Sequence, residues 1–137
     1  MVNVIMGLKG SGKTKRLISL VKQAVEEEIG DVICIEKRTE LMFDIPHSVR
    51  LIGTADYDFG SYEYLKGFIS GLHAGNYDIT HIFIDSLYKV VDNSTNEETE
   101  AFLDWCDKFS EREKVKFTIT ISGDEKEASE GIKKYFI

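Results

Sequence analysis

Residues 7–14 read Gly-Leu-Lys-Gly-Ser-Gly-Lys-Thr, which follows the pattern GxxxxGK[ST], and they stand between two segments of different periodicity. The apolar run at residues 2–6 is typical of a buried strand. From residue 13 to residue 28, apolar side chains recur every three or four positions, which predicts an amphipathic helix that ends at Gly30. The motif is therefore expected to join a strand to the N-terminus of a helix.

A loop in this position is suited to binding phosphate. The first N–H groups of a helix have no partner inside the helix, and the helix dipole is positive there. In this pattern Lys13 is expected to reach the β- and γ-phosphates of a nucleoside triphosphate as a catalytic charge, and the Thr14 hydroxyl to bind Mg²⁺. The alternative is an ordinary glycine-rich turn with a solvated lysine. The predicted nucleotide-binding residues of the loop are Gly7, Leu8, Lys9, Gly10, Ser11, Gly12, Lys13, Thr14 and Lys15.

Length and charge narrow the class of protein. The chain has 137 residues and a formal net charge of −7. This length is typical of one domain, so residues 1–137 are predicted to form a single nucleotide-binding domain. The acidic balance disfavours nucleic acid as a partner, because phosphate backbones are bound mainly through accumulated Lys and Arg. The sequence has no signal peptide and no membrane span, which predicts a cytoplasmic protein, and Cys34 and Cys106 are expected to be ordinary buried thiols.

Strand-like and helical patterns alternate along the rest of the chain. Residues 31–36, 49–53, 80–85 and 117–122 have strand character, and helices are expected before Gly75 and after residue 96. Residues 37–48 are expected to be either a loop or one helical turn. This alternation predicts an α/β fold of three layers, with helices on both faces of a mainly parallel sheet of about five strands.

A second candidate site closes the strand at residues 80–85. Four residues, His-Ile-Phe-Ile, precede Asp85, and a carboxylate after an apolar strand is the pattern that holds Mg²⁺ in many nucleotide-binding enzymes. Asp85 is therefore predicted to be a metal ligand together with Thr14. The alternative is that Asp85 is only a helix cap or a loop residue.

With these two motifs, a Walker A loop at residues 7–14 and a Walker B-like strand at residues 82–85, the chain resembles the P-loop NTPase superfamily. The branch it resembles, which includes the RecA-like, AAA+ and ABC ATPases, inserts one strand between the two motif strands. The resemblance implies that residues 117–122 form this inserted strand. It also implies that Ser122 or Thr120, near the end of that strand, contacts the γ-phosphate; otherwise these residues only reflect the preference of threonine for strands.

One position departs from this family pattern. Many members carry a glutamate directly after the Walker B aspartate, where it activates the attacking water, but here that residue is Ser86. RecA-like members carry the glutamate on another strand, which makes Glu36 the candidate catalytic base. The alternative for Glu36 is a solvated residue at the point where the chain leaves the sheet. Arg38, Arg50 and Arg112 are candidate arginines for a neighbouring subunit's site, should the protein form a homo-oligomer.

Three functions are compatible with the motifs. The first is a Mg²⁺-dependent ATP-binding protein that hydrolyses ATP slowly or when a protein partner activates it, with ATP favoured over GTP because the sequence NKxD is missing. The second is a small-molecule kinase in which Asp56 and Asp58 face the acceptor. The third is a nucleotide switch that does not hydrolyse ATP, which Ser86 favours.

Overall fold

The computed structural model describes residues 1–92 and 94–137, and this part of the chain contains a five-stranded parallel sheet. The strands lie in the order β1-β5-β4-β2-β3, and every neighbouring pair is parallel. The strand that carries the loop of residues 7–14 is thus separated from β4 by β5, as the sequence predicted. The strands are β1 Val2–Gly7, β2 Asp31–Glu36, β3 Arg50–Gly53, β4 Ile79–Ile84 and β5 Lys116–Ser122.

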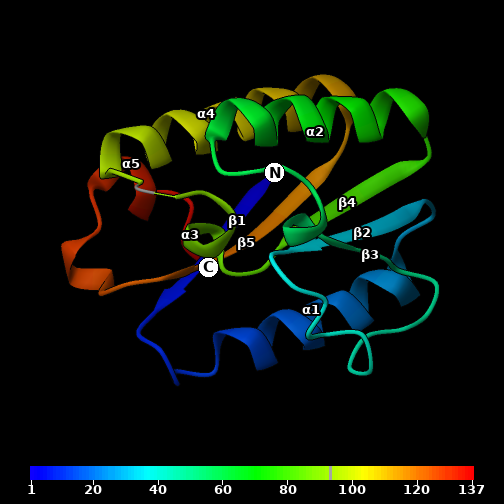
Figure 1. The fold of residues 1–137 in the computed structure, drawn as a ribbon, viewed down its shortest axis with the longest axis horizontal. Helices are drawn as coiled ribbons and strands as arrows, with labels where there is room; N and C mark the ends of the chain where they lie inside the picture. The colour runs from blue at the N-terminus through cyan, green and yellow to red at the C-terminus, as the bar shows by residue number, and fades with distance from the viewer. Residues whose placement is uncertain (93) are drawn as a thin grey trace.

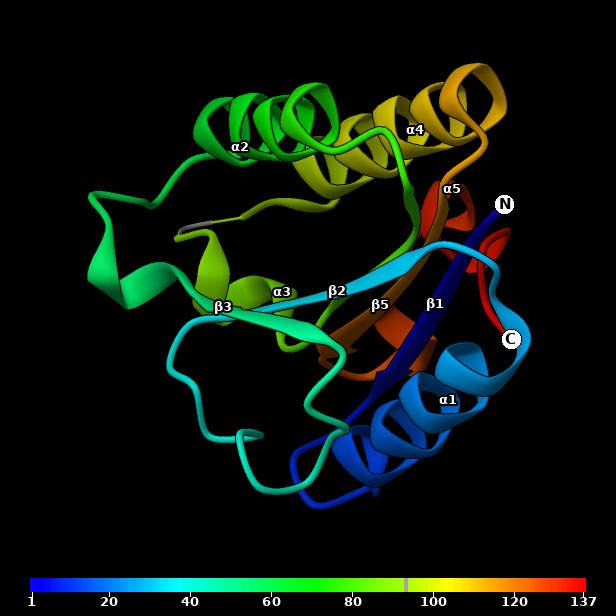
Figure 2. The same ribbon diagram turned by 90° about the vertical axis from the view of Figure 1, so that its right-hand side faces the viewer.

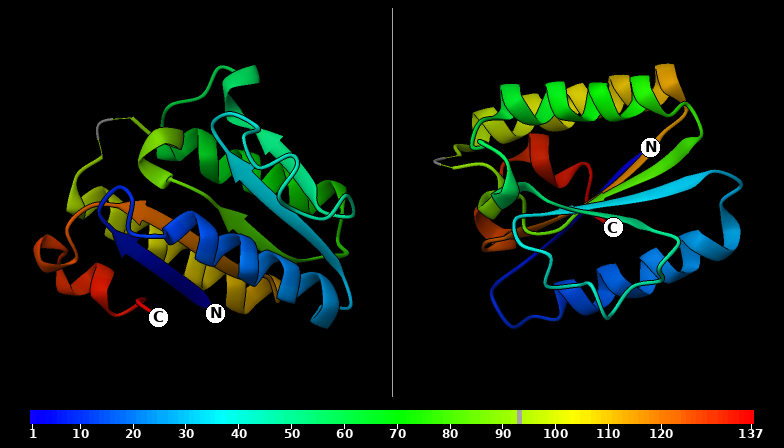
Figure 3. Two further views of the ribbon diagram at one scale, coloured as in Figure 1. Left: turned by 90° about the horizontal axis from the view of Figure 1, so that it is seen from below. Right: turned by 45° about the vertical axis from the view of Figure 1, so that its right-hand side comes forward.

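Helices cover both faces of the sheet. Figure 1 shows α2 (Tyr62–Gly75) and α4 (Asn96–Glu113) along one face and α1 (Lys13–Glu27) along the other. The turned view in Figure 2 shows the same three layers, and in the view from below in Figure 3 α1 lies over the sheet. Short helices complete the structure: 3₁₀ turns at Thr54–Asp56 and Glu125–Glu127, α3 at Leu87–Val90 and α5 at Glu130–Lys133. The predicted three-layer α/β fold is confirmed.

The sheet is buried on both faces because side chains alternate along each strand. On β4, Ile82 and Ile84 are fully buried in the core beneath α2 and α4. Phe83 lies between them in the chain and is fully buried on the other face, where it packs with Leu17 and Val21 of α1. Near-continuous apolar runs are what a strand buried on both sides requires.

The loop between β2 and β3 belongs to the α1 layer. It contains no helix, so the loop alternative holds, with a turn in which the Asp44 N–H donates to the Leu41 carbonyl. Leu41, Ile45 and Val49 are buried against α1. This loop leads directly away from Glu36, and its packing therefore fixes the surroundings of that carboxylate.

Two other local expectations have different outcomes. The N-terminus of α4 has a capping box between Thr95 and Glu98, one of the two pairings that the sequence allows. The polar run at residues 93–96, Asn-Ser-Thr-Asn, predicts a turn before this helix, and its first residue, Asn93, lies outside the described residues. The sequence places Gly67 and Gly71 one turn apart in α2, a spacing that predicts close packing of this helix on the sheet. This is wrong, because both are exposed and a Cβ at either would meet no atom within 4 Å.

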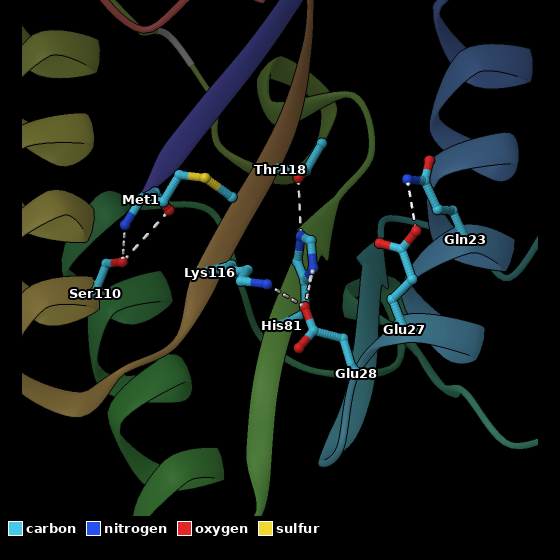
Figure 4. Close-up of polar contacts among 8 residues, drawn as sticks. All are labelled: Met1, Gln23, Glu27, Glu28, His81, Ser110, Lys116 and Thr118. Carbon is cyan, nitrogen blue, oxygen red and sulfur yellow. Dashed lines mark hydrogen bonds and ion pairs between the residues drawn. The ribbon is translucent and has the colours of Figure 1, made fainter.

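Further contacts cover the β1 edge of the sheet and its far end. The edge strand β1 is followed outward by the C-terminal residues, which form a bridge between Val4 and Phe136. At the end of the sheet opposite the loop of residues 7–14, His81 lies between Glu28 and Thr118 (Figure 4). Among the helices that the structure describes, none is long and apolar enough to cross a membrane.

Candidate functional site

The motif residues meet at one edge of the sheet. Because all five strands are parallel, their carboxyl ends lie on the same side, which is where ligands bind in open α/β sheets. Gly7 ends β1, Glu36 ends β2 and Asp85 directly follows β4. β2 and β4 pair through Ile35 and Ile84, so the two carboxylates leave neighbouring strands at the same level.

The loop of residues 7–14 forms the start of α1. Gly10 and Gly12 have φ values of 85° and 88°, in the left-handed region that residues with a Cβ rarely adopt. Gly12 is the N-cap and offers no side chain to the first N–H groups of the helix. Lys13 is buried, and its Nζ donates to the Leu8 carbonyl at 3.1 Å, so the side chain lies back across the loop. This arrangement presents free backbone donors and one ammonium group to an anion.

The other residues predicted to bind the nucleotide lie around the turn that leads from β1 into α1. Gly7 is buried, and a Cβ there would come within 2.4 Å of the Ser11 Oγ. Leu8, Lys9, Ser11 and Lys15 are exposed. They are open to a ligand from solvent, and Leu8 and Ser11 line a cavity of about 340 Å³ with Gly7 and residues 124–126.

Thr14 and Asp85, the two predicted metal ligands, lie in contact although 71 positions separate them in the chain. The Thr14 Oγ1 donates to the Asp85 Oδ1 at 3.5 Å. The same Oδ1 accepts a shorter hydrogen bond, 2.7 Å, from the Thr120 hydroxyl of β5. Asp85 itself is buried. The carboxylate is thus held in one orientation beside the hydroxyl with which it would share a metal ion.

Thr120 and Ser122, the two residues of β5 expected to contact the γ-phosphate, differ in burial and in their contacts. Thr120 is fully buried; its hydroxyl donates to Asp85 and accepts from the Ser86 N–H at 2.7 Å. These contacts position Asp85 and the turn that follows it. Ser122 is exposed and pairs with Gly7 in the sheet register, which leaves its side chain at the base of the loop. Of the two, only Ser122 is open to a bound nucleotide.

Ser86 adopts the left-handed conformation, with φ 56° and ψ 66°. A residue with a Cβ is strained there, and such strain persists where the surroundings over-determine it. The hydrogen bond from its N–H to Thr120 is one such constraint. The chain therefore turns sharply after Asp85 and directs α3 along the carboxyl edge of the sheet.

Glu36 is buried, with 5% of its surface exposed, so the alternative of a solvated residue is wrong. Its Oε2 accepts the Leu41 N–H at 3.1 Å. Burial raises the pKa of Glu36, and the nearby charge of Asp85 adds to this; the backbone N–H groups of Leu41 and Glu40 act in the opposite direction. A buried carboxylate with a raised pKa beside a second carboxylate is a group suited to proton transfer.

A cavity of about 240 Å³ joins Glu36 to Asp85. Three cationic residues also line it: Lys37, Arg38 and Lys89. Of the three arginines singled out in the sequence, only Arg38 lies at this cavity: Arg50 begins β3, and Arg112 is in the last turn of α4 near Glu113. Lys37 and Lys89 were not predicted. Lys37 directly follows β2 and Lys89 lies in the short helix α3, and no sequence motif marks a lysine in either place as part of a cavity.

The residues fit a magnesium ion that a nucleotide brings with it. The described residues contain no group of three or more His, Cys, Asp or Glu side chains that would hold a metal by themselves. Mg²⁺ usually takes one or two protein ligands, keeps several waters and completes its shell with phosphate oxygens. Thr14 and Asp85, whose side chains are in contact, would supply such a pair of oxygen ligands.

Comparison with solved structures identifies the fold. The chain is similar to the flagellar accessory protein FlaH from Methanocaldococcus jannaschii, with a TM-score of 0.61 and 16% sequence identity. The similarity covers 97% of this chain but only 65% of the FlaH chain. No protein-family profile matches the sequence, and no curated protein matches it either. The likeness to FlaH shows that the two proteins share an α/β fold, which in this chain is built on one five-stranded parallel sheet.

Proposed function

We propose that the chain binds ATP with Mg²⁺ at the loop of residues 7–14 and hydrolyses it slowly, at a rate that a protein partner or a second copy of the chain increases. The observation that carries the proposal is the contact between Thr14 and Asp85. Two motifs far apart in the sequence thus supply the oxygen ligands of one metal site, the hydroxyl of Thr14 and the carboxylate of Asp85. A glycine-rich turn without a ligand would have no need of that pairing.

The protein's own groups divide the work of such a reaction. The N–H groups at the start of α1 bind the phosphate oxygens, and Lys13 leaves its contact with Leu8 to place its charge between the β- and γ-phosphates. Mg²⁺ held by Thr14 and Asp85 would neutralise charge on the phosphates. Thr120 keeps Asp85 in position.

Glu36 is the group proposed to take the proton from the attacking water. It is a carboxylate at the correct edge of the sheet, and its raised pKa brings it closer to the neutral range in which a general base is most effective. Ser86 has no such capacity at an ordinary hydroxyl pKa. The proton transfer depends on one buried carboxylate, so we expect slow turnover in the isolated chain.

A calorimetric titration with Mg-ATP tests the binding site. We expect the wild-type protein to bind with micromolar to sub-millimolar affinity. A hydrogen bond to a charged group contributes about 1.5–3 kcal/mol, so Lys13→Ala is expected to weaken binding by about ten- to hundredfold. The control is Lys22→Ala, which removes an exposed lysine from the same helix. Wild-type affinity in Lys13→Ala would contradict the proposal.

A small-molecule kinase is a second candidate, and one observation favours it. Asp58 lines a cavity of about 250 Å³ that shares residues with the cavity at Asp85 and Glu36. Asp56, the other aspartate of the predicted pair, does not line it. The kinase hypothesis therefore depends on Asp58 alone. Transfer of label from γ-labelled ATP to a metabolite is the result that would establish it.

A further inference from the structure

The carboxyl edge of the sheet has a cleft larger than the phosphates of a nucleotide need. Two cavities, of about 240 Å³ and about 250 Å³, share Lys37, Arg38 and Lys89 and so form one cleft. The inner cavity reaches Asp85 and Glu36. The outer cavity continues over the end of β3 to Asp58 and Asp92, beside the rings of Tyr57 and Phe59. Together they reach the size of a site for a small molecule.

Both cations and carboxylates line this cleft, and the carboxylates are Glu36, Glu40, Asp58, Asp85 and Asp92. None of the six ion pairs found among the described residues involves Lys37, Arg38 or Lys89. Asp58 and Asp92 are also absent from those pairs. Lys37, Arg38 and Lys89 therefore keep their side-chain N–H donors for an external anion, although the net charge of the protein is −7. Close positive charges repel one another, and an anion among them relieves that repulsion.

The cleft adjoins the proposed nucleotide site at Asp85 and Glu36 and extends away from it. The loop of residues 7–14 lies at the end of β1, at one side of the sheet, and the phosphates that it binds would end at Thr14 and Asp85. The cleft begins at Asp85 and extends in the other direction, over β2 and β3. A second ligand in the cleft would therefore lie next to the terminal phosphate and would not compete with the nucleotide.

We propose that this cleft binds a small phosphorylated molecule that carries hydroxyl groups, beside the bound nucleotide. Lys37, Arg38 and Lys89 bind its phosphate, since an arginine fork and lysine ammonium groups are the usual partners of phosphate oxygens. Asp58 and Asp92 accept hydrogen bonds from its hydroxyls. The inference deepens the proposed function, on which it rests, by naming the class of a second ligand.

Nuclear magnetic resonance of the complete chain tests the proposal through the backbone amides of Lys37, Arg38 and Lys89. The protein is saturated with Mg²⁺ and a non-hydrolysable ATP analogue, and glycerol 3-phosphate, glucose 6-phosphate and AMP are added separately. We expect at least one of them to shift these amides along a saturable curve, while glycerol, glucose and adenosine leave them unchanged. The proposal fails when none of the three phosphates shifts them at millimolar concentration, or when the unphosphorylated compounds bind equally well.

Charge-neutralised variants show whether the cations hold the phosphate. Arg38→Gln and Lys89→Gln are each expected to weaken binding of the shifted compound by about tenfold or more, because each removes a charged hydrogen-bond donor. Lys22→Gln, an exposed lysine of α1, is the matched control and is expected to bind as the wild type does. Equal affinity in all three variants would overturn the proposal.

The same spectra separate this inference from the proposed function. In the Lys13→Ala variant without nucleotide, the phosphorylated compound is still expected to shift the amides of Lys37, Arg38 and Lys89. Shifts at Gly10 and Gly12 would report binding at the loop of residues 7–14 instead. When the ATP analogue shifts the loop amides of the wild-type protein but no phosphate shifts the cleft, only the second ligand is refuted. When the analogue shifts nothing, the proposed function itself fails.

Discussion

Glu36 shows at the scale of one residue why the carboxyl edge has the properties of a reactive site. A carboxylate loses hydration when it is buried, and this loss raises the pKa of Glu36. Leu41 offers one N–H to its Oε2, which compensates in part. No opposite charge is paired with Glu36 among the ion pairs of the described residues. A purely structural position would be satisfied more easily by an apolar side chain.

Replacement of Glu36 tests its role as a base. Glu36→Gln keeps an oxygen for the Leu41 N–H but removes the proton acceptor, so we expect turnover to fall by about a hundredfold or more while Mg-ATP affinity stays within about twofold. The wild-type rate is expected to decline on the acid side with an apparent pKa above the ordinary glutamate value. Phosphate release measured from pH 5 to pH 8 checks both.

Glu40→Gln is the matched control for this prediction. Glu40 lines the same cavity but is exposed, so its replacement is expected to leave the rate at pH 8 unchanged. Its charge helps to raise the pKa of Glu36, so the acid limb is expected to move slightly toward lower pH. Unchanged turnover in Glu36→Gln would show that Glu36 is not the base.

The residues of the site differ in how visible they are in the sequence. The loop of residues 7–14 and Asp85 are parts of local patterns, in which neighbouring residues reveal the role. Glu36 could be named only through the resemblance to RecA-like members, which carry the glutamate on another strand, and through its place at the end of a strand. Lys89 reaches the cavity from the short helix α3. The contact of Thr120 with Asp85 joins β5 to the end of β4 across 35 positions in the chain. No local sequence pattern encodes either feature.

At the scale of elements, apolar periodicity was enough to locate the strands and the long helices. β2 begins and ends at the predicted residues, and α1, which was predicted to end at Gly30, ends at Glu27. Strands buried on both faces must be apolar throughout, which makes them easy to recognise. Gly67 and Gly71 were misjudged because the sequence does not show which side of α2 faces the sheet at those positions.

The capping box of α4 gives a test at this scale. The Thr95 hydroxyl accepts the Glu98 N–H at 3.2 Å, and the Glu98 carboxylate accepts the Thr95 N–H at 3.2 Å. Thr95→Ala removes the hydroxyl and is expected to lower the free energy of unfolding by about 1 kcal/mol. Thr95→Ser keeps it and is expected to stay close to the wild type. Urea unfolding at pH 7 measures both, and equal stability of the two variants would show that the cap contributes nothing.

The whole molecule has two chemically different ends. The carboxyl ends of the strands gather the loop of residues 7–14, two carboxylates and three cations around open space. At the amino ends, polar side chains from the end of α1 and from β4 and β5 contact one another. His81 contacts the Glu28 carboxylate at 3.3 Å through Nδ1 and the Thr118 hydroxyl at 2.9 Å through Nε2, and Lys116 also pairs with Glu28 (Figure 4). This end joins α1 to β4 and β5 and serves the stability of the fold.

This buried network predicts that acid destabilises the protein. Burial lowers the pKa of His81 to about 4 despite the contact with Glu28, and the charges of Lys116 and the N-terminus act in the same direction as burial. An unfolded histidine has a pKa near 6.5, so between these two values the unfolded chain binds a proton that the folded chain does not. Stability is therefore expected to fall as the pH falls from about 6.5 to about 4. At about 1.4 kcal/mol for each pKa unit, the loss amounts to a few kcal/mol.

Variants of two histidines assign this loss to one residue. Urea unfolding at pH 7, 6, 5 and 4.5 is expected to show a steep decrease of the unfolding free energy in the wild type. His81→Gln cannot take up a proton, and its amide can replace both hydrogen bonds, so its stability is expected to vary less over the same range. His47→Gln changes an exposed histidine and is expected to retain the wild-type slope. The pKa of Glu28 is also low: burial opposes this, but Lys116 and His81 outweigh it, so its contribution is lost only at more acidic pH. Equal slopes for His81→Gln and the wild type would show that His81 does not link folding to protons.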